Sequence, residues 1–143
     1  MSFFEHAFKQ ALYAKNNDEV PVGAVIVCDG RIIAASPNVM RAQHNPTAHA
    51  ELECIRMASR VLQTTHLTEC DLYVTLEPCA MCAGAIAHAR IRRLIFGAYD
   101  PKGGAVEHGA RVFQYSLHKP EVVGGVNESV CSALLYDFFQ GKR

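Results

Sequence analysis

The 143-residue sequence has no apolar run long enough to cross a bilayer, and no basic start followed by an apolar core of the kind that directs export. It has no internal repeat, low-complexity tract or linker-like stretch. Fourteen basic and fourteen acidic residues cancel, so net charge gives no reason to expect a nucleic-acid partner. We therefore expect one cytoplasmic domain over residues 1–143 without membrane contact, in which the apolar half of the residues forms a core.

The six cysteines are not expected to form disulfide bonds, because a reducing compartment keeps thiols free. Cys79 and Cys82 stand three residues apart and are expected to bind a metal ion. Small buried side chains are expected at three further positions: Cys28, Cys54 and Cys131.

Hydrophobic periodicity predicts alternating helices and strands. Helices are expected at about 3–16, 48–62 and 78–90 and after Asn127, which is expected to cap the last one; strands are expected at 22–28, 31–35, 71–77, 93–98 and 121–126. Asp29-Gly30 favours a type I′ hairpin between the first two strands. The strand, helix and strand from 71 to 98 predict a parallel crossover, so the sheet is expected to be mixed.

Two short segments carry the chemistry: His49-Ala50-Glu51 and Pro78-Cys79-Ala80-Met81-Cys82. One imidazole and two thiolates make three zinc ligands and leave one tetrahedral position for water. Cysteines three apart lie on one helical turn, and a helix N-terminus favours the thiolate form that binds metal. The two helix tips are therefore expected to converge on one zinc ion.

Glu51 is expected to carry protons. On an ideal helix a residue two positions after His49 points about 200° away from it, which makes Glu51 a poor fourth ligand. A carboxylate beside the ion can take a proton from the bound water and return it to the substrate. Hydrolytic removal of an amine requires this transfer.

Three other interpretations of these residues stay open. The C-x-x-C pair at a helix start is also typical of redox proteins, although His49 and Glu51 then have no role. A closed structural zinc site is possible if a fourth ligand comes from another side chain: Cys54, Cys70 or His44. The third interpretation keeps the chemistry but changes the substrate to a free nucleobase such as guanine or cytosine.

The motifs resemble the zinc-dependent cytidine deaminase superfamily and, within it, the bacterial tRNA-specific adenosine deaminases. The resemblance runs from about Phe4 to the C-terminus. Five stretches carry it in order: residues 21–25 (PVGAV), 45–51 (NPTAHAE), 72–79 (LYVTLEPC), 81–86 (MCAGAI) and 100–102 (DPK).

The resemblance implies an α/β protein with a three-layer α/β/α cytidine-deaminase-like fold and a mixed five-stranded sheet. It implies a homodimer with one Zn²⁺ per subunit and a water or hydroxide as the fourth ligand. It also implies that the tRNA anticodon stem-loop is the partner, and that adenosine at the wobble position, typically of an arginine tRNA, is converted to inosine.

The resemblance also assigns roles to residues. His49, Cys79 and Cys82 hold zinc, and zinc hydroxide attacks C6 of adenine while Glu51 shuttles protons. The ligand set itself does not distinguish adenine C6 from cytosine C4. Substrate-binding roles fall on four further residues: Asn38, Ala50, Asp100 and Lys102. Alternatively, the Asp100 side chain bonds to its own loop backbone and Lys102 is simply solvated.

Overall fold

The computed structural model describes residues 1–142. Along the chain, its elements are α1 (Phe3–Asn16), β1 (Gly23–Cys28), β2 (Arg31–Pro37), α2 (Ala50–Leu62), β3 (Cys70–Leu76), α3 (Ala80–Ala89), β4 (Arg93–Ala98), the short 3-10 helix η1 (Val112–Gln114), β5 (Glu121–Val123) and α4 (Glu128–Gln140). The predicted succession of helices and strands is confirmed.

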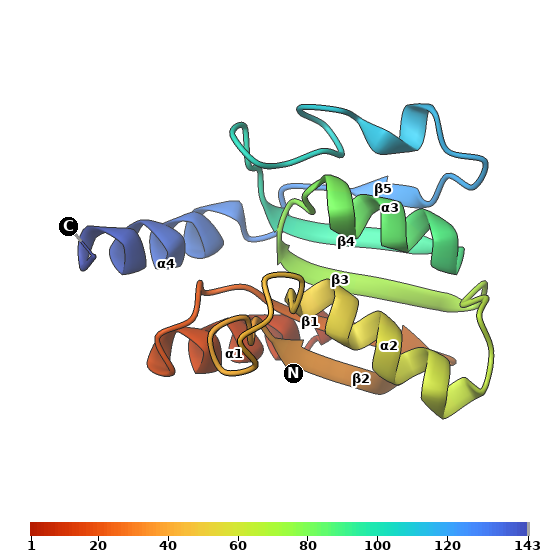
Figure 1. The fold of residues 1–143 in the computed structure, drawn as a ribbon, viewed down its shortest axis with the longest axis horizontal. Coiled ribbons are helices and arrows are strands. Elements are labelled where there is room, and N and C mark those ends of the chain that lie inside the picture. The colour runs from red at the N-terminus through yellow and green to blue at the C-terminus, as the bar shows by residue number, and fades with distance from the viewer. Residues whose placement is uncertain (143) are drawn as a thin grey trace.

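The strands form one mixed sheet in the order β2-β1-β3-β4-β5 (Figure 1). β1 pairs antiparallel with β2 and with β3, whereas β3, β4 and β5 run parallel. Asp29 and Gly30 have φ angles of 54° and 75°, which is the left-handed conformation that a type I′ turn requires at both central residues. The predicted hairpin and the predicted parallel crossover are both confirmed.

Alternating side chains place the sheet between two helical layers. Ala24 and Ile26 of β1 pack into the main core with α2 and α3, and Val25 and Val27 pack against Ala7 of α1. Successive strand residues point to opposite faces, so an almost continuous apolar strand is buried on both sides. A further cluster joins α1, β4 and α4 through Phe4, Ile95, Ala98 and Cys131. The α/β/α architecture with a mixed five-stranded sheet is confirmed.

Several element boundaries differ from the predicted ones. α2 and α3 begin at Ala50 and Ala80, and His49 and Cys79 precede them in extended conformation as the N-cap residues. The two helices therefore start two residues later than periodicity indicated. Asn127 occupies the predicted N-cap position of α4, but it has φ 51° and its side chain makes no capping hydrogen bond. Asparagine tolerates the left-handed conformation, so it serves the turn before α4 instead.

Among the helices of residues 1–142, none combines the length and the apolar character needed to span a bilayer.

The close approach of α1 to β1 requires glycine at position 23. A Cβ atom there would lie 2.2 Å from the Ala7 carbonyl oxygen and 2.3 Å from the Ala11 nitrogen. We expect Gly23→Ala to lower the free energy of unfolding by about 2–3 kcal/mol, because backbone rather than a flexible side chain must move. Denaturant unfolding measures this change. Gly141→Ala is the control, since its Cβ would come no closer than 3.5 Å to other atoms, and an equal loss in both variants would contradict the packing argument.

Candidate active site

His49, Cys79 and Cys82 form a cluster at the end of the sheet where β3 terminates and α2 and α3 begin (Figure 1). Their ligand atoms all lie within 4.8 Å of one another. His49 Nδ1 is 3.7 Å from Cys79 Sγ and 3.5 Å from Cys82 Sγ. Zinc–nitrogen and zinc–sulfur bonds of about 2.0–2.3 Å in tetrahedral geometry separate nitrogen from sulfur by about 3.6 Å. The three residues therefore fit one zinc ion.

The local backbone explains why these three side chains meet. His49 and Cys79 are N-cap residues with extended backbone, so each side chain projects from the tip of its helix. Cys82 lies in the first turn of α3, from which its sulfur reaches the same point. Both helix tips direct positive partial charge towards the cluster, which favours thiolate.

The two thiols of the cluster have different pKa values. Hydrogen bonding from Cys82, with a further contribution from His49, lowers the pKa of the Cys79 thiol to about 4. The hydrogen bond with Cys79 raises the pKa of Cys82, and burial raises it further. The pKa of His49 is raised, chiefly by its hydrogen bond with Cys79. The lowered pKa of Cys79 favours its thiolate form, which is the form that binds metal.

Glu51 lies beside the cluster with only 4% of its surface exposed. Burial raises the pKa of its carboxyl to about 7, although the charge of His49 opposes this shift. A group with a pKa near 7 can both accept and release a proton at neutral pH. The environment of Glu51 therefore suits the transfer of protons.

A pocket of about 210 Å³ opens next to the cluster. Its walls are Val20, Val22, Asn38, Met40, His49, Glu51, Leu76, Glu77, Cys79, Asp100 and Gly103. This volume is below the range of about 300–1,000 Å³ that is usual for drug-sized ligands. The pocket is of a size to receive one planar base.

Two of the four expected substrate-binding residues line this pocket, and two do not. Asn38 is buried and accepts a hydrogen bond from the Ala50 N–H at 2.8 Å. Ala50 is fully buried, and its N–H is engaged with Asn38. Lys102 lies outside the pocket, and Asp100 accepts hydrogen bonds from the N–H groups of Lys102 and Gly103. The Asp100 side chain thus bonds to its own loop backbone while it also forms part of the wall.

A second hollow of about 570 Å³ adjoins the pocket and shares Val20, Leu76 and Asp100 with it. Lys102 lies here. The hollow runs between the loop after β4 and helix α4, and three aromatic side chains line it with exposed fractions of 38%, 65% and 49%: Tyr99, Tyr136 and Phe139. Exposed aromatic rings beside a base-sized pocket provide surfaces on which further bases can stack.

The side chains considered as a fourth ligand do not join the cluster, which within residues 1–142 consists of His49, Cys79 and Cys82. The Cys54 thiol donates to the Ala24 carbonyl oxygen at 3.3 Å. Cys70 is fully buried in the main core, where burial raises the pKa of its thiol to about 12. The arrangement is that of an open site, which favours catalysis over a purely structural role.

Sequence reasoning missed Glu77, which lines the pocket and has a completely buried side chain. Burial raises the pKa of its carboxyl, but hydrogen bonds from Asp100, His108, Glu107 and Val106 bring the net pKa below the ordinary value. The available signal was a carboxylate directly after an apolar strand and directly before Pro78. Strand ends are where site residues gather in sheets with parallel strands.

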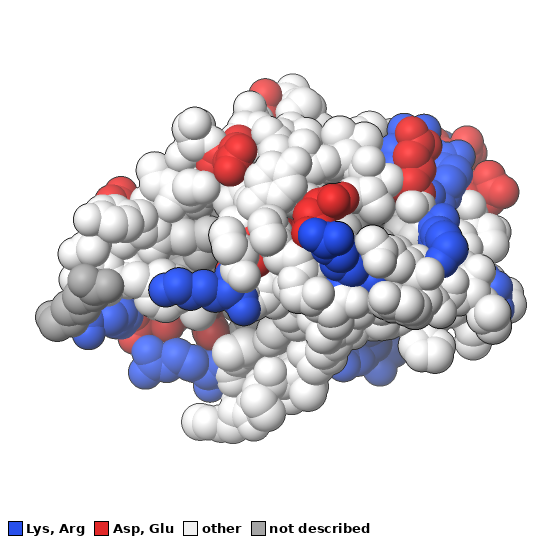
Figure 2. Space-filling model, turned by 90° about the horizontal axis from the view of Figure 1, so that it is seen from above, with Lys and Arg blue, Asp and Glu red and all other residues white. Residues whose placement is uncertain are grey.

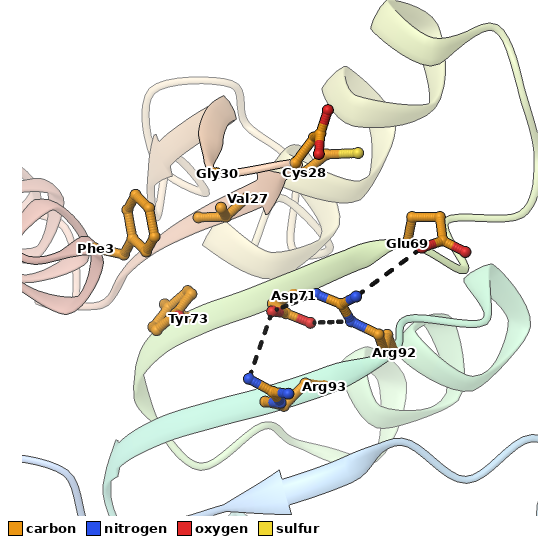
Figure 3. A pocket seen from close by; sticks show the side chains of 10 residues that line it. Phe3, Val27, Cys28, Gly30, Glu69, Asp71, Tyr73, Arg92 and Arg93 are labelled. Atoms are coloured by element: carbon orange, nitrogen blue, oxygen red, sulfur yellow. Dashed lines mark hydrogen bonds and ion pairs between the residues drawn. The ribbon is translucent and has the colours of Figure 1, made fainter.

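A third hollow lies at the opposite end of β3 (Figure 3). Its arginines already have acidic partners: Arg92 forms two hydrogen bonds with Asp71, at 2.9 and 3.0 Å, and Arg93 lies 3.9 Å from the same carboxylate. Glu69 and Asp29 add further negative charge to the walls. This hollow is therefore not a basic site, and the candidate catalytic residues lie at the other end of the sheet.

The fold and the cluster define a zinc-site protein of the deaminase type, and comparison with known proteins agrees. Residues 1–98 match the family described as the cytidine and deoxycytidylate deaminase zinc-binding region. A tRNA-specific adenosine deaminase from Agrobacterium fabrum is 53% identical over 143 residues, covering 99% of this chain and 94% of that protein. Another from Bacillus subtilis is 42% identical, covering 99% and 89%.

Solved structures give the same result. A structure from work on A-to-I editing by tRNA:A34 deaminases superposes with a TM-score of 0.91 at 53% identity, covering 93% of this chain and 98% of that one. A guanine deaminase from Bacillus subtilis gives 0.65 at 42% identity, covering 68% and 62%. The chain belongs to the tRNA-specific adenosine deaminase family within the zinc-binding cytidine and deoxycytidylate deaminases.

We expect purified protein to contain zinc and Cys82→Ser to lose most of it, because a serine hydroxyl is a far weaker zinc ligand than a thiolate. Atomic absorption gives the zinc content. Cys54→Ser is the matched control: its thiol is equally buried but bonds to Ala24, a partner that a hydroxyl can keep. Equal zinc in both variants would show that Cys82 is not a ligand.

Proposed function

We propose that the protein hydrolyses adenosine to inosine at the wobble position of a tRNA anticodon, with one zinc ion per subunit. The observation that carries this proposal is a cluster of three zinc-type ligands beside a buried carboxylate, on the wall of a base-sized pocket. Family membership supports tRNA as the substrate class.

His49, Cys79 and Cys82 would hold the ion and leave its fourth position to water. When bound, zinc supplies the Lewis acidity that makes water a nucleophile for C6 of adenine at neutral pH. These ligands cannot by themselves complete the reaction, which also requires protons to move from the water to the ring and to the departing amine.

Glu51 moves these protons. Its carboxylate accepts a proton from the attacking water and delivers it to N1 of the ring. It then takes the remaining proton of the hydroxyl added at C6 and gives it to the amine, which leaves as ammonia while the C6 carbonyl forms. Water and adenosine are thereby converted to inosine and ammonia without any other reactant. The burial that raises the pKa of Glu51 to about 7 supports both the uptake and the release.

Asn38 orients the base. Its Oδ1 is held by the Ala50 N–H, which fixes the amide plane and leaves Nδ2 to donate to a ring acceptor. The same hydrogen bond ties Asn38 to the tip of α2, which carries both His49 and Glu51. One local structure thus positions both the side chain that binds the base and the catalytic groups.

An RNA loop suits the surroundings of the pocket better than a duplex or a free base. Figure 2 shows basic and acidic side chains interspersed on one face, consistent with zero net charge. We therefore expect stacking and pocket shape to contribute to recognition. The hollow lined by Tyr99, Tyr136 and Phe139 provides stacking surfaces for neighbouring bases. Anticodon loop bases splay out at less cost than paired bases. On the family resemblance, we propose an arginine tRNA as the natural substrate.

We expect Glu51→Gln to lower turnover on an adenosine-containing anticodon stem-loop by about 10²–10⁴-fold, since an amide cannot carry the protons. Zinc content should stay at the wild-type level. Inosine formation at the first anticodon position, measured by nucleoside analysis, tests both statements. Equal activity of the variant and wild type would contradict the assigned role of Glu51.

A free nucleobase such as guanine or cytosine is the second candidate substrate, because the pocket is of a size to receive one base and the guanine deaminase mentioned above shares 42% identity over part of its length. Free adenine, guanine and cytosine therefore belong in the same assay. Rapid turnover of a free base without turnover of any stem-loop would contradict the proposal and favour a nucleobase deaminase. Incubation with total bacterial tRNA identifies the tRNA species that gains inosine.

We further propose a homodimer that forms through α3 and the segment after η1. Leu117 and Tyr115 are 98% and 82% exposed, which is unusual for large apolar side chains. Leu117 lines a hollow of about 260 Å³ together with Gly84, Ala87 and His88 of α3. A second copy of the chain would cover this apolar surface.

We expect light scattering to give a dimer for wild type and a monomer for Leu117→Glu, because a carboxylate cannot be buried unpaired in an apolar interface. Tyr13→Glu, on the exposed side of α1 across the sheet, should remain dimeric. A dimer that persists in Leu117→Glu would place the interface elsewhere.

A further inference from the structure

Glu77 bonds to one continuous segment of the chain. Its Oε1 accepts from the Asp100 N–H at 3.0 Å and contacts His108 Nδ1 at 2.8 Å. Its Oε2 accepts from the N–H groups of Val106, Glu107 and His108 at 3.1, 2.9 and 3.1 Å. One buried carboxylate thus binds both ends of residues 100–108, which are called the rim segment below.

The rim segment forms one side of the substrate pocket. Asp100 and Gly103 line the pocket, and the Ala105 N–H donates to the Pro78 carbonyl oxygen at 2.9 Å, directly before the ligand Cys79. Glu77 itself is held by its own N–H, which donates to the Ala98 carbonyl oxygen at 2.8 Å. Glu77 therefore joins the end of the sheet to the Pro78-Cys79 turn and to the rim of the pocket.

The fit around the carboxylate leaves no room for another side chain. A Cβ atom on Gly104 would lie 2.5 Å from Glu77 Cδ and 2.6 Å from the Asp100 carbonyl oxygen. The rim segment can thus close over Glu77 only because position 104 is glycine. Three backbone N–H groups in succession converge on one oxygen, an arrangement that suits an ionised acceptor.

A short loop turn could satisfy these N–H groups with water or with neutral side chains. A buried carboxylate is a costlier alternative, and specifying a single geometry is one use of such a group. Here the specified geometry is the distance between the rim segment and the helix tip that carries Cys79.

We infer that Glu77 is a positioning residue for the proposed deamination: its carboxylate fixes residues 100–108 as the rigid rim of the pocket. The inference rests on the proposed function for its effect on activity. Glu77 lines the pocket, but its side chain is completely buried, so in this role it acts through Asp100, Gly103 and the Pro78-Cys79 turn.

Glu77→Gln tests this role. The amide nitrogen of glutamine is a donor, so it would face backbone N–H groups that now donate to a carboxylate oxygen of Glu77. Asp71→Asn is the matched control. Asp71 is also a buried carboxylate of the β3 region with several donors, but it lies at the far end of the strand against Arg92 (Figure 3). Both variants lose hydrogen bonds to a buried acid, and only Glu77→Gln loosens the rim.

In Glu77→Gln, we expect amide hydrogen exchange at Asp100, Val106, Glu107 and His108 to accelerate at least about ten-fold. On the anticodon stem-loop, kcat/KM should fall at least about ten-fold, with most of the change in KM and with zinc content unchanged. Asp71→Asn should show neither effect. Gly104→Ala should show both effects, since its Cβ displaces the same segment.

Unchanged exchange and unchanged kcat/KM in Glu77→Gln would overturn the inference. An equal fall of kcat/KM in Asp71→Asn would also overturn it, because a general loss of stability would then explain both variants. If wild type forms no inosine, the proposed function fails instead, and the exchange comparison still decides whether Glu77 anchors the rim.

Discussion

The meeting of two helix N-termini at the end of β3 is the constraint on which the site depends. His49 at the tip of α2 and Cys79 with Cys82 at the tip of α3 come within 4.8 Å of one another only because both helices pack on the same face of the sheet. The parallel pairing of β3 and β4 fixes the crossover that places α3 there. The core of Ile26, Leu72 and Phe96 therefore helps to determine the geometry of the cluster.

Buried carboxylates organise the surroundings of this cluster in a protein without net charge. Glu51 has no charged partner that fully offsets its burial, and its pKa rises to about 7. Glu77 receives several N–H donors, so its net pKa shift is downward. Glu19, also buried, accepts from the N–H groups of Arg41 and Ala42 and so holds the loop that contains Met40. Burial that hydrogen bonds do not offset suits proton transfer, and burial with many donors suits anchoring.

Local sequence patterns predicted the parts of the structure that local physics determines. Asp29-Gly30 predicted its hairpin because only two left-handed residues complete a type I′ turn. The C-x-x-C spacing and His49 predicted the cluster because few other roles use these residues together. Contacts between distant segments were not predictable in this way. The Glu77 partners lie 23 to 31 residues away, and the engagement of the Ala50 N–H depends on Asn38, 12 residues earlier.

X-ray absorption at the zinc edge of the purified, zinc-loaded protein measures the central feature directly, because it reports the identity and distance of the atoms around the ion. One imidazole and two thiolates with an open position predict two sulfur atoms at about 2.3 Å, together with two lighter nitrogen or oxygen atoms at about 2.0–2.1 Å. A shell of three or four sulfur atoms, or a fully protein-derived shell without an exchangeable water, would contradict it.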